Sequence, residues 1–135
     1  MSTVLANTIT AVGGGGSTVK VNNDSTYISD GGAVTDSNLV QGLAKMWANL
    51  DGTGTAALDD SFNASGLTDN GTGDFTVAIN NDMSNANYSC QFNGNSAHVG
   101  LTAIATGSLR VFVTAANDSS QDVDPVTYLA HGDLA

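Results

Sequence analysis

Two segments, "DGTGTAALDD" at 51–60 and "NGTGDFTV" at 70–77, repeat a Gly-Thr-Gly core of the kind that can cradle a phosphate. A phosphate-binding loop places its glycines between a strand and a helix whose N-terminal amides face the anion, and the nucleotide-hydrolysing version adds a Lys. Both segments instead run into further strand pattern, with neither feature. We therefore predict two hairpin turns, and Asn70-Gly71 in the second is a strong signal for a type I′ turn.

Clustered aspartates suggest calcium, which prefers several oxygen ligands. The segment 51–62 comes nearest to a calcium loop, but it has Ala where a central Gly is needed and it lacks the terminal bidentate Glu. An irregular site built from Asp118, Asp122 and Asp124, or from Asp59 and Asp60, stays open. The alternative is that these residues occupy solvated turns that keep the protein soluble.

The remaining candidates for catalysis do not form a constellation. His98 and His131 have no second His or Cys at ligand spacing, and no Gly-x-Ser-x-Gly elbow supplies a nucleophile, so we expect two strand residues at a surface or interface. Asp59 and Asp60 are adjacent, so in a strand they face opposite sides and cannot act as an acid and base pair. The single cysteine, Cys90, is expected to be a small buried hydrophobe. We predict no catalytic site and no cofactor, and no metal site other than the irregular aspartate site left open above.

Aromatic side chains offer stacking platforms for sugars. The candidates are Trp47, Tyr88, Phe92 and Tyr128. With aromatic residues at 6% of the chain, core packing explains them first, and a carbohydrate contact at an exposed Tyr or Trp is the alternative.

Charge and hydropathy exclude several classes of partner. The formal net charge is −10, and the three basic residues, Lys20, Lys45 and Arg110, are scattered, so no patch neutralises a run of phosphates. Nucleic acid is therefore not an expected partner. No apolar run approaches the roughly 20 residues of a membrane span, and the N-terminus lacks the pattern of a secretory signal, so we expect no membrane insertion.

The composition predicts a mainly β protein with tight turns, because all thirteen acidic residues are Asp, which favours caps and turns. We expect an extended arm with a Gly-rich joint at 1–17, a small hairpin and a short helix within 18–45, and an antiparallel β-sandwich or jelly-roll-like domain at 46–135. The hairpin would use strands at 18–21 and 25–29. The helix, over 37–45, would present an apolar stripe of Leu39, Leu43 and Met46.

Alternation of apolar and polar residues marks the strands of the last segment. Three runs place every second side chain on one face: Met46, Ala48 and Leu50; Phe75, Val77 and Ile79; and Leu109, Val111 and Val113. Trp47 points to the opposite side of its strand. Pro125 is expected to start the last strand at a sheet edge, because proline cannot donate to a ladder.

The block from Gln41 to Tyr88 resembles a module of virion proteins of tailed bacteriophages, especially marine ones. The pattern runs approximately as Lys-x-Trp-x-x-Phe-[Asn/Asp]-Gly-Thr-Gly, Ser-Phe-Asn-[Val/Ala]-Ser, Thr-Asp-Asn-Gly-Thr-Gly-Asp-[Tyr/Phe]-Thr-Val and Met-x-x-Ala-Asn-Tyr. The matching residues are Lys45, Trp47, Gly52, Thr53, Gly54, Phe62, Asn63, Ser65, Asp69 to Asp74, Thr76, Met83, Ala86, Asn87 and Tyr88. The ends "ANTIT", "STYISDGG" and "HGDLA" also resemble such fibre proteins. Leu50 departs from the usual aromatic, and 89–108 follows no fixed pattern.

The resemblance implies a non-enzymatic structural protein of the phage particle, a tail-fibre or related appendage domain that is typically trimeric. The short chain suits a small fibre or a capsid decoration (cement) protein, made in the host cytoplasm and exposed on the virion. We hypothesise that residues 1–17 dock on capsid or tail proteins by strand addition. Val4, Leu5, Asn7 and Ile9 would make that contact, and Leu39, Leu43 and Met46 would form the homotrimer contact. The alternatives are a receptor-binding tail-fibre protein that recognises a host surface glycan, and a depolymerase enzyme.

Overall fold

The computed structural model describes residues 26–27, 37–38, 43–95 and 97–135. The chain divides into two compact units, Met1–Val40 and Gln41–Ala135. The first contains two short strands, β1 (Thr26–Tyr27) and β2 (Ser37–Asn38), which pair antiparallel. The partner described for the strand predicted at 25–29 is therefore β2, and the other predicted partner, 18–21, lies outside the described residues.

The predicted helix over 37–45 is wrong in its described part. Residues 37–38 belong to β2, and residues 43–45 are not helical. The amide of Lys45 instead donates to the carbonyl of Ala130 over 2.8 Å, and Met46 begins the next strand. Pairing with a distant strand outweighs the helical spacing of three apolar residues, since a helix that short has little stability of its own.

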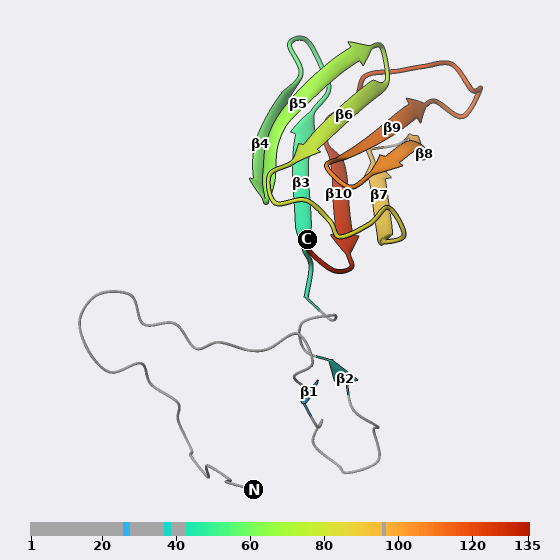
Figure 1. Cartoon of the computed structure of the whole chain (residues 1–135). Helices are drawn as coiled ribbons and strands as arrows, with labels where there is room; N and C mark the ends of the chain where they lie inside the picture. The colour runs from blue at the N-terminus through green and yellow to red at the C-terminus, as the bar shows by residue number, and fades with distance from the viewer. Residues whose placement is uncertain (1–25, 28–36, 39–42, 96) are drawn as a thin grey trace, which may run out of the picture. The chain divides into compact units, whose positions relative to one another are not determined.

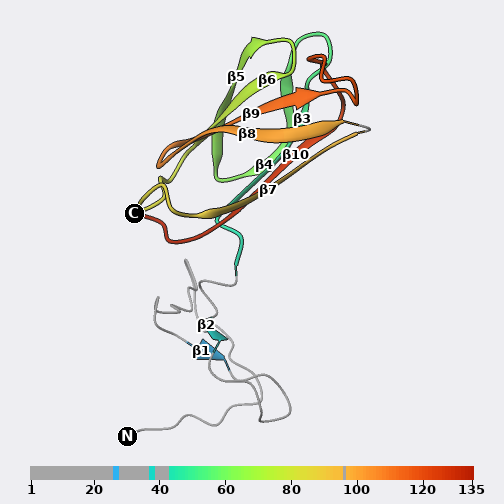
Figure 2. The same ribbon diagram turned by 90° about the vertical axis from the view of Figure 1, so that its right-hand side faces the viewer.

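The second unit consists of eight antiparallel strands in two four-stranded sheets that face each other (Figures 1 and 2). One sheet has the order β4-β3-β10-β7 and the other the order β5-β6-β9-β8. The strands are β3 (Met46–Asp51), β4 (Ala57–Phe62), β5 (Ala64–Gly71), β6 (Asp74–Ile79), β7 (Ser89–Gly94), β8 (His98–Ala105), β9 (Ser108–Thr114) and β10 (Val126–His131). The prediction of a mainly β, antiparallel domain is confirmed.

The hydrophobic core lies between the sheets and comes mostly from the two inner strands of each. Each of these four strands buries every second side chain, as expected for a strand with one face on the core. The buried residues are Met46, Ala48 and Leu50 of β3, Phe75, Val77 and Ile79 of β6, Leu109, Val111 and Val113 of β9, and Val126, Tyr128 and Ala130 of β10, together with Met83 and Tyr88. All three predicted alternating faces are confirmed.

Asn63 joins the two sheets where β4 ends and β5 begins. Its backbone has a φ of 58°, a left-handed conformation that Asn tolerates better than most residues. Its side-chain amide donates to the carbonyls of Lys45 and Asn81 over 2.9 and 3.1 Å, and its Oδ1 accepts from the amide of Asn81 over 2.8 Å. One side chain thus fixes the corner to two other segments.

Pro125 directly precedes β10, as predicted, but that strand is not at an edge. It lies between β3 and β7 and pairs with both. The proline is tolerated because it precedes the first residue of the ladder, Val126, so no ladder position needs its missing N–H.

Candidate functional site

The first Gly-Thr-Gly segment forms the turn of the β3–β4 hairpin. The amide and hydroxyl of Thr53 donate to Oδ1 of Asp51 over 2.7 and 2.6 Å, and these bonds lower the pKa of that carboxyl. The loop amide therefore binds a carboxylate of its own chain. A hairpin turn, not a phosphate cradle, is confirmed here.

The second Gly-Thr-Gly segment also forms a hairpin, between β5 and β6, but its turn is not at the predicted residues. Positive φ occurs at Gly71 (128°) and Gly73 (70°), and the pairing shifts between Asp69 and Gly71, so Asn70 lies in a bulge. The side chain of Asn70 donates to Oγ1 of Thr76 over 2.9 Å. The turn itself lies two residues further along the chain, at Thr72 and Gly73.

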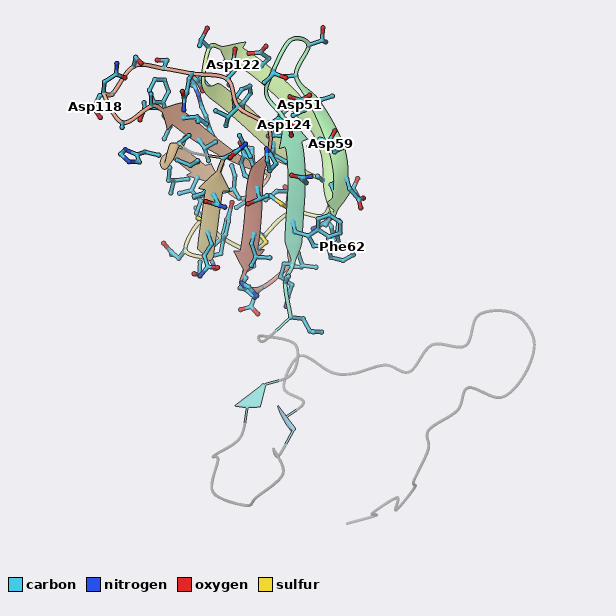
Figure 3. All side chains as sticks on the ribbon, turned by 180° about the vertical axis from the view of Figure 1, so that it is seen from behind. Asp51, Asp59, Phe62, Asp118, Asp122 and Asp124 are labelled. Atoms are coloured by element: carbon cyan, nitrogen blue, oxygen red, sulfur yellow. The ribbon has the colours of Figure 1, made fainter. Side chains whose placement is uncertain are left out.

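The aspartates of the predicted calcium sites have separate roles. Asp122 accepts the amide of Gly73 over 2.7 Å, and Asp118 occupies a turn with a φ of 63°, apart from Asp122 and Asp124 in Figure 3. Partial desolvation of Asp124, followed by repulsion from Asp51 and Asp59, raises the pKa of Asp124. Within 43–95 and 97–135, no three His, Cys, Asp or Glu side chains gather closely enough to hold a metal ion.

Asp59 and Asp60 do not alternate across their strand as predicted. The pairing of β3 with β4 shifts between Asn49 and Leu50, which leaves Asp59 as an extra residue beside the Asp60–Asn49 pair. Both carboxylates are exposed. A bulge of this kind interrupts the strict alternation of the pleat.

The histidines and the cysteine are strand residues. His98 is exposed on β8 and His131 ends β10, half-buried. Cys90 is half-buried against the core, and burial raises the pKa of its thiol, which lowers the fraction of reactive thiolate at neutral pH. Burial, with a smaller effect from Cys90, raises the pKa of Tyr88 to about 12.

Of the four aromatic residues proposed as sugar platforms, three pack in or against the core. Tyr88 and Tyr128 are buried, and Phe92 is half-buried with its ring 5.4 Å from that of Tyr128 in an edge-on arrangement. Core packing, the first explanation for these aromatic residues, is therefore confirmed for these three. Trp47 is exposed at 36%, and the structure adds Phe62, exposed at 53%.

Trp47 and Phe62 lie directly opposite each other on the outside of the β4-β3-β10-β7 sheet. Residues paired in this way have Cβ atoms about 5 Å apart, so the two side chains start from adjacent positions on the same face. The pairing continues across the sheet as Phe62, Trp47, Leu129 and Gln91, and the next outward row is Asp60, Asn49, Thr127 and Asn93. We call these eight residues the outer row pair.

A shallow hollow lies beside Trp47 on the same sheet. It is lined by Gln91, Phe92, Asn93, Thr127, Tyr128 and Leu129, none of which is charged. In the adjoining row, Oδ1 of Asn49 is buried and has no hydrogen-bond partner in the described part of the chain. The sequence pattern predicted that Trp47 points outward. It did not predict that Phe62 and the amide side chains of Gln91 and Asn93 lie near it, because their proximity depends on the register of four strands.

The predicted docking and oligomer residues have a mixed outcome. Val4, Leu5, Asn7, Ile9 and Leu39 lie outside the described residues. Leu43 is exposed at 55%, but Met46 is fully buried in the core of the two-sheet domain. Met46 therefore cannot share a trimer contact with Leu43. The predicted stripe is wrong because the side chain of Met46 is buried between the two sheets.

Comparisons with protein-family models, with curated proteins and with solved structures find no match to this chain. Among the described residues, the structure contains no helix with the length and apolar character needed to cross a membrane.

Proposed function

We propose that the chain is a non-enzymatic structural protein of a tailed-phage virion, exposed on the particle as a small fibre or capsid decoration protein. The observation that carries the proposal is the place of the motif residues within the two-sheet domain. They occupy turns, corners and close contacts of the fold, which is the distribution expected of a module selected for its shape. Two-sheet β domains, jelly rolls included, are used in viral coats and in lectins.

Several motif residues have identifiable structural tasks. A Cβ on Gly52 would lie 2.7 Å from Cζ of Phe75, so the glycine allows the β3–β4 turn to approach the core. Asn63 fixes the corner between the sheets, and the carboxylate of Asp74 binds Arg110 in a bidentate pair. Met83 and Tyr88 are buried, and the hydroxyl of Tyr88 donates to the carbonyl of Ala105 over 2.8 Å.

In this proposal the two units have different tasks. Residues 1–17 act as an arm that docks on capsid or tail proteins, and the two-sheet domain projects from the particle. Its strong negative charge limits non-specific association of neighbouring copies. A homotrimer remains part of the proposal on the family resemblance, with contacts other than the stripe that includes Met46.

The first test is the copy number in purified virions, measured by quantitative mass spectrometry against the major capsid protein. A stoichiometry equal to the capsid subunit, or a simple fraction of it, supports a decoration protein, and a handful of copies supports a fibre. Absence from purified particles would reject a virion role.

The second test deletes residues 2–12 and measures binding of the purified protein to particles that lack it. We expect binding to be lost while circular dichroism shows a folded β domain. Unchanged binding would reject docking through the arm.

A further inference from the structure

We propose that the outer row pair and the adjoining hollow form a binding site for a neutral oligosaccharide. The inference goes beyond the proposed structural function and does not depend on it. Its starting point is that exposed aromatic rings and uncharged hydrogen-bonding side chains gather on one face of the β4-β3-β10-β7 sheet.

The aromatic part of this face is accessible and continuous. Phe62 and Trp47 are exposed at 53% and 36%, and Leu129, directly opposite Trp47 on β10, extends the apolar strip toward β7. Large apolar side chains brought together on a surface mark an interaction site more often than single exposed ones. Exposed aromatic rings can stack on a flat apolar surface, and the apolar side of a sugar ring offers one.

Polar groups next to the rings supply the hydrogen bonds that hydroxyl groups require. The hollow contributes the amides of Gln91 and Asn93 and the hydroxyl of Thr127, and each can donate or accept. Asn49, opposite Thr127, has a buried Oδ1 that lacks a partner in the described part of the chain. Because that atom is buried, the hydrogen bonds to a ligand come from Gln91, Asn93 and Thr127.

The charge distribution favours a neutral ligand over an ionic one. The hollow has no charged lining residue, and Asp60 is the single carboxylate in the outer row pair. Of the aspartates labelled in Figure 3, Asp51 and Asp124 lie toward the opposite end of the sheet from Phe62, whereas Asp59 lies beside the Asp60–Asn49 pair. An anionic ligand would be repelled by a chain of net charge −10, and a cationic ligand would find its partners at that other end.

The dimensions favour an oligosaccharide over a single sugar. Neighbouring strands lie about 4.8 Å apart, so a row across four strands spans about 14 Å. A chain of sugar rings laid along the row would meet the aromatic pair at β4 and β3, Leu129 and Thr127 at β10, and the amides of Gln91 and Asn93 at β7.

The test is affinity electrophoresis in native gels that contain dextran, yeast mannan or an arabinogalactan, with alginate as the acidic control. We expect at least one neutral polysaccharide to retard the wild-type protein and alginate to leave it unaffected. Phe62→Ala and Trp47→Ala should each weaken binding about tenfold, the loss expected for one stacking ring. Gln91→Ala tests the hydrogen-bonding half of the site and should also weaken binding.

Phe112→Ala is the matched control, because Phe112 is exposed at 38% on the outside of the other sheet. It should retain full retardation. Circular dichroism of every variant separates lost binding from lost folding. Absence of retardation in all three neutral gels, or an equal loss in Phe112→Ala, would overturn the proposal.

A second copy of the chain is the competing occupant of this face. Sedimentation velocity of the wild type and of Phe62→Ala distinguishes the two cases. If Phe62→Ala converts an oligomer to monomer and no neutral polysaccharide binds, the face is a contact between copies and the oligosaccharide proposal fails.

Discussion

Gly73 is the glycine at which replacement by alanine should lower the free energy of unfolding most. Its φ of 70° lies in the left-handed region, and a Cβ would meet the carbonyl oxygen of Val113 at 2.4 Å and the amide of Gln121 at 3.0 Å. Its own amide donates to Asp122, and its carbonyl accepts from Val113, each over 2.7 Å. The turn therefore connects the β5–β6 hairpin to β9 and to the segment before β10.

Gly54 provides a matched control for Gly73→Ala. It has nearly the same φ, 62°, but a Cβ there would find no atom within 4 Å. Left-handed backbone costs a non-glycine residue about 1–2 kcal/mol, and the stiffer unfolded chain offsets about 0.4–1 kcal/mol. We expect Gly54→Ala to lower the free energy of unfolding by about 1 kcal/mol.

Gly73→Ala has the same cost from the left-handed backbone as Gly54→Ala, and it adds a steric cost. Overpacking against backbone atoms costs about 1–3 kcal/mol, and displacement of the turn weakens hydrogen bonds worth about 1 kcal/mol each. We expect a total loss of about 3–5 kcal/mol.

Urea unfolding, followed by circular dichroism and by the fluorescence of Trp47, measures both variants. Equal losses for Gly54→Ala and Gly73→Ala would refute the argument, because they would mean that φ alone decides the cost. The expected loss for Gly73→Ala accompanied by a changed dependence of the unfolding free energy on urea concentration would also weaken the argument. Such a change would mean that the substitution alters the unfolded state.

Two further predictions concern charge. Asp74→Asn should lower the free energy of unfolding by up to about 1 kcal/mol at neutral pH, a modest loss because Arg110 is 41% exposed. Hydrogen bonds from Arg110 lower the folded-state pKa of Asp74 below its ordinary 3.8, so its contribution to stability is present above that value and is lost as the pH falls. The unfolding free energies of the wild type and of Asp74→Asn, measured from pH 7 to pH 3, should therefore converge. A constant difference over that range would contradict this prediction. Asp124→Asn should raise the thermal midpoint at pH 7, because desolvation and repulsion from Asp51 and Asp59 raise the pKa of Asp124 and make its ionised form unfavourable in the folded state. That gain should shrink as the pH falls through the folded-state pKa, since the wild-type carboxyl becomes protonated there, and a lower midpoint at pH 7 would show that the carboxylate has a stabilising partner.

The strands of the core were predictable from the sequence because burial of one sheet face imposes a period of two. Phe75, Val77 and Ile79 follow that period without interruption, and so do the residues of β9. Hairpins at both Gly-Thr-Gly segments were equally local, because glycine supplies backbone angles that other residues avoid. These features depend on residues that are close in the chain.

The same local information failed where a distant segment competes. Met46 has the spacing of a helix stripe with Leu39 and Leu43, yet it lies in the core because β10 offers a complete ladder of hydrogen bonds. The type I′ signal at Asn70-Gly71 failed because Asn70 lies in a bulge and the turn forms two residues further along the chain. Pro125 suggested an edge strand, although β10 is central, because one missing N–H before a strand does not specify its neighbours.

The candidate binding face depends on long-range pairing in the same way. The sequence placed Trp47 on the outside of its strand, since its neighbours Met46 and Ala48 face inward. Nothing local joins Trp47 to Phe62, fifteen positions away, or to Gln91 on a strand two places across the sheet. Side-chain alternation determines which way a residue points, whereas the register between strands determines what it points beside, and that register is set by the packing of the whole core.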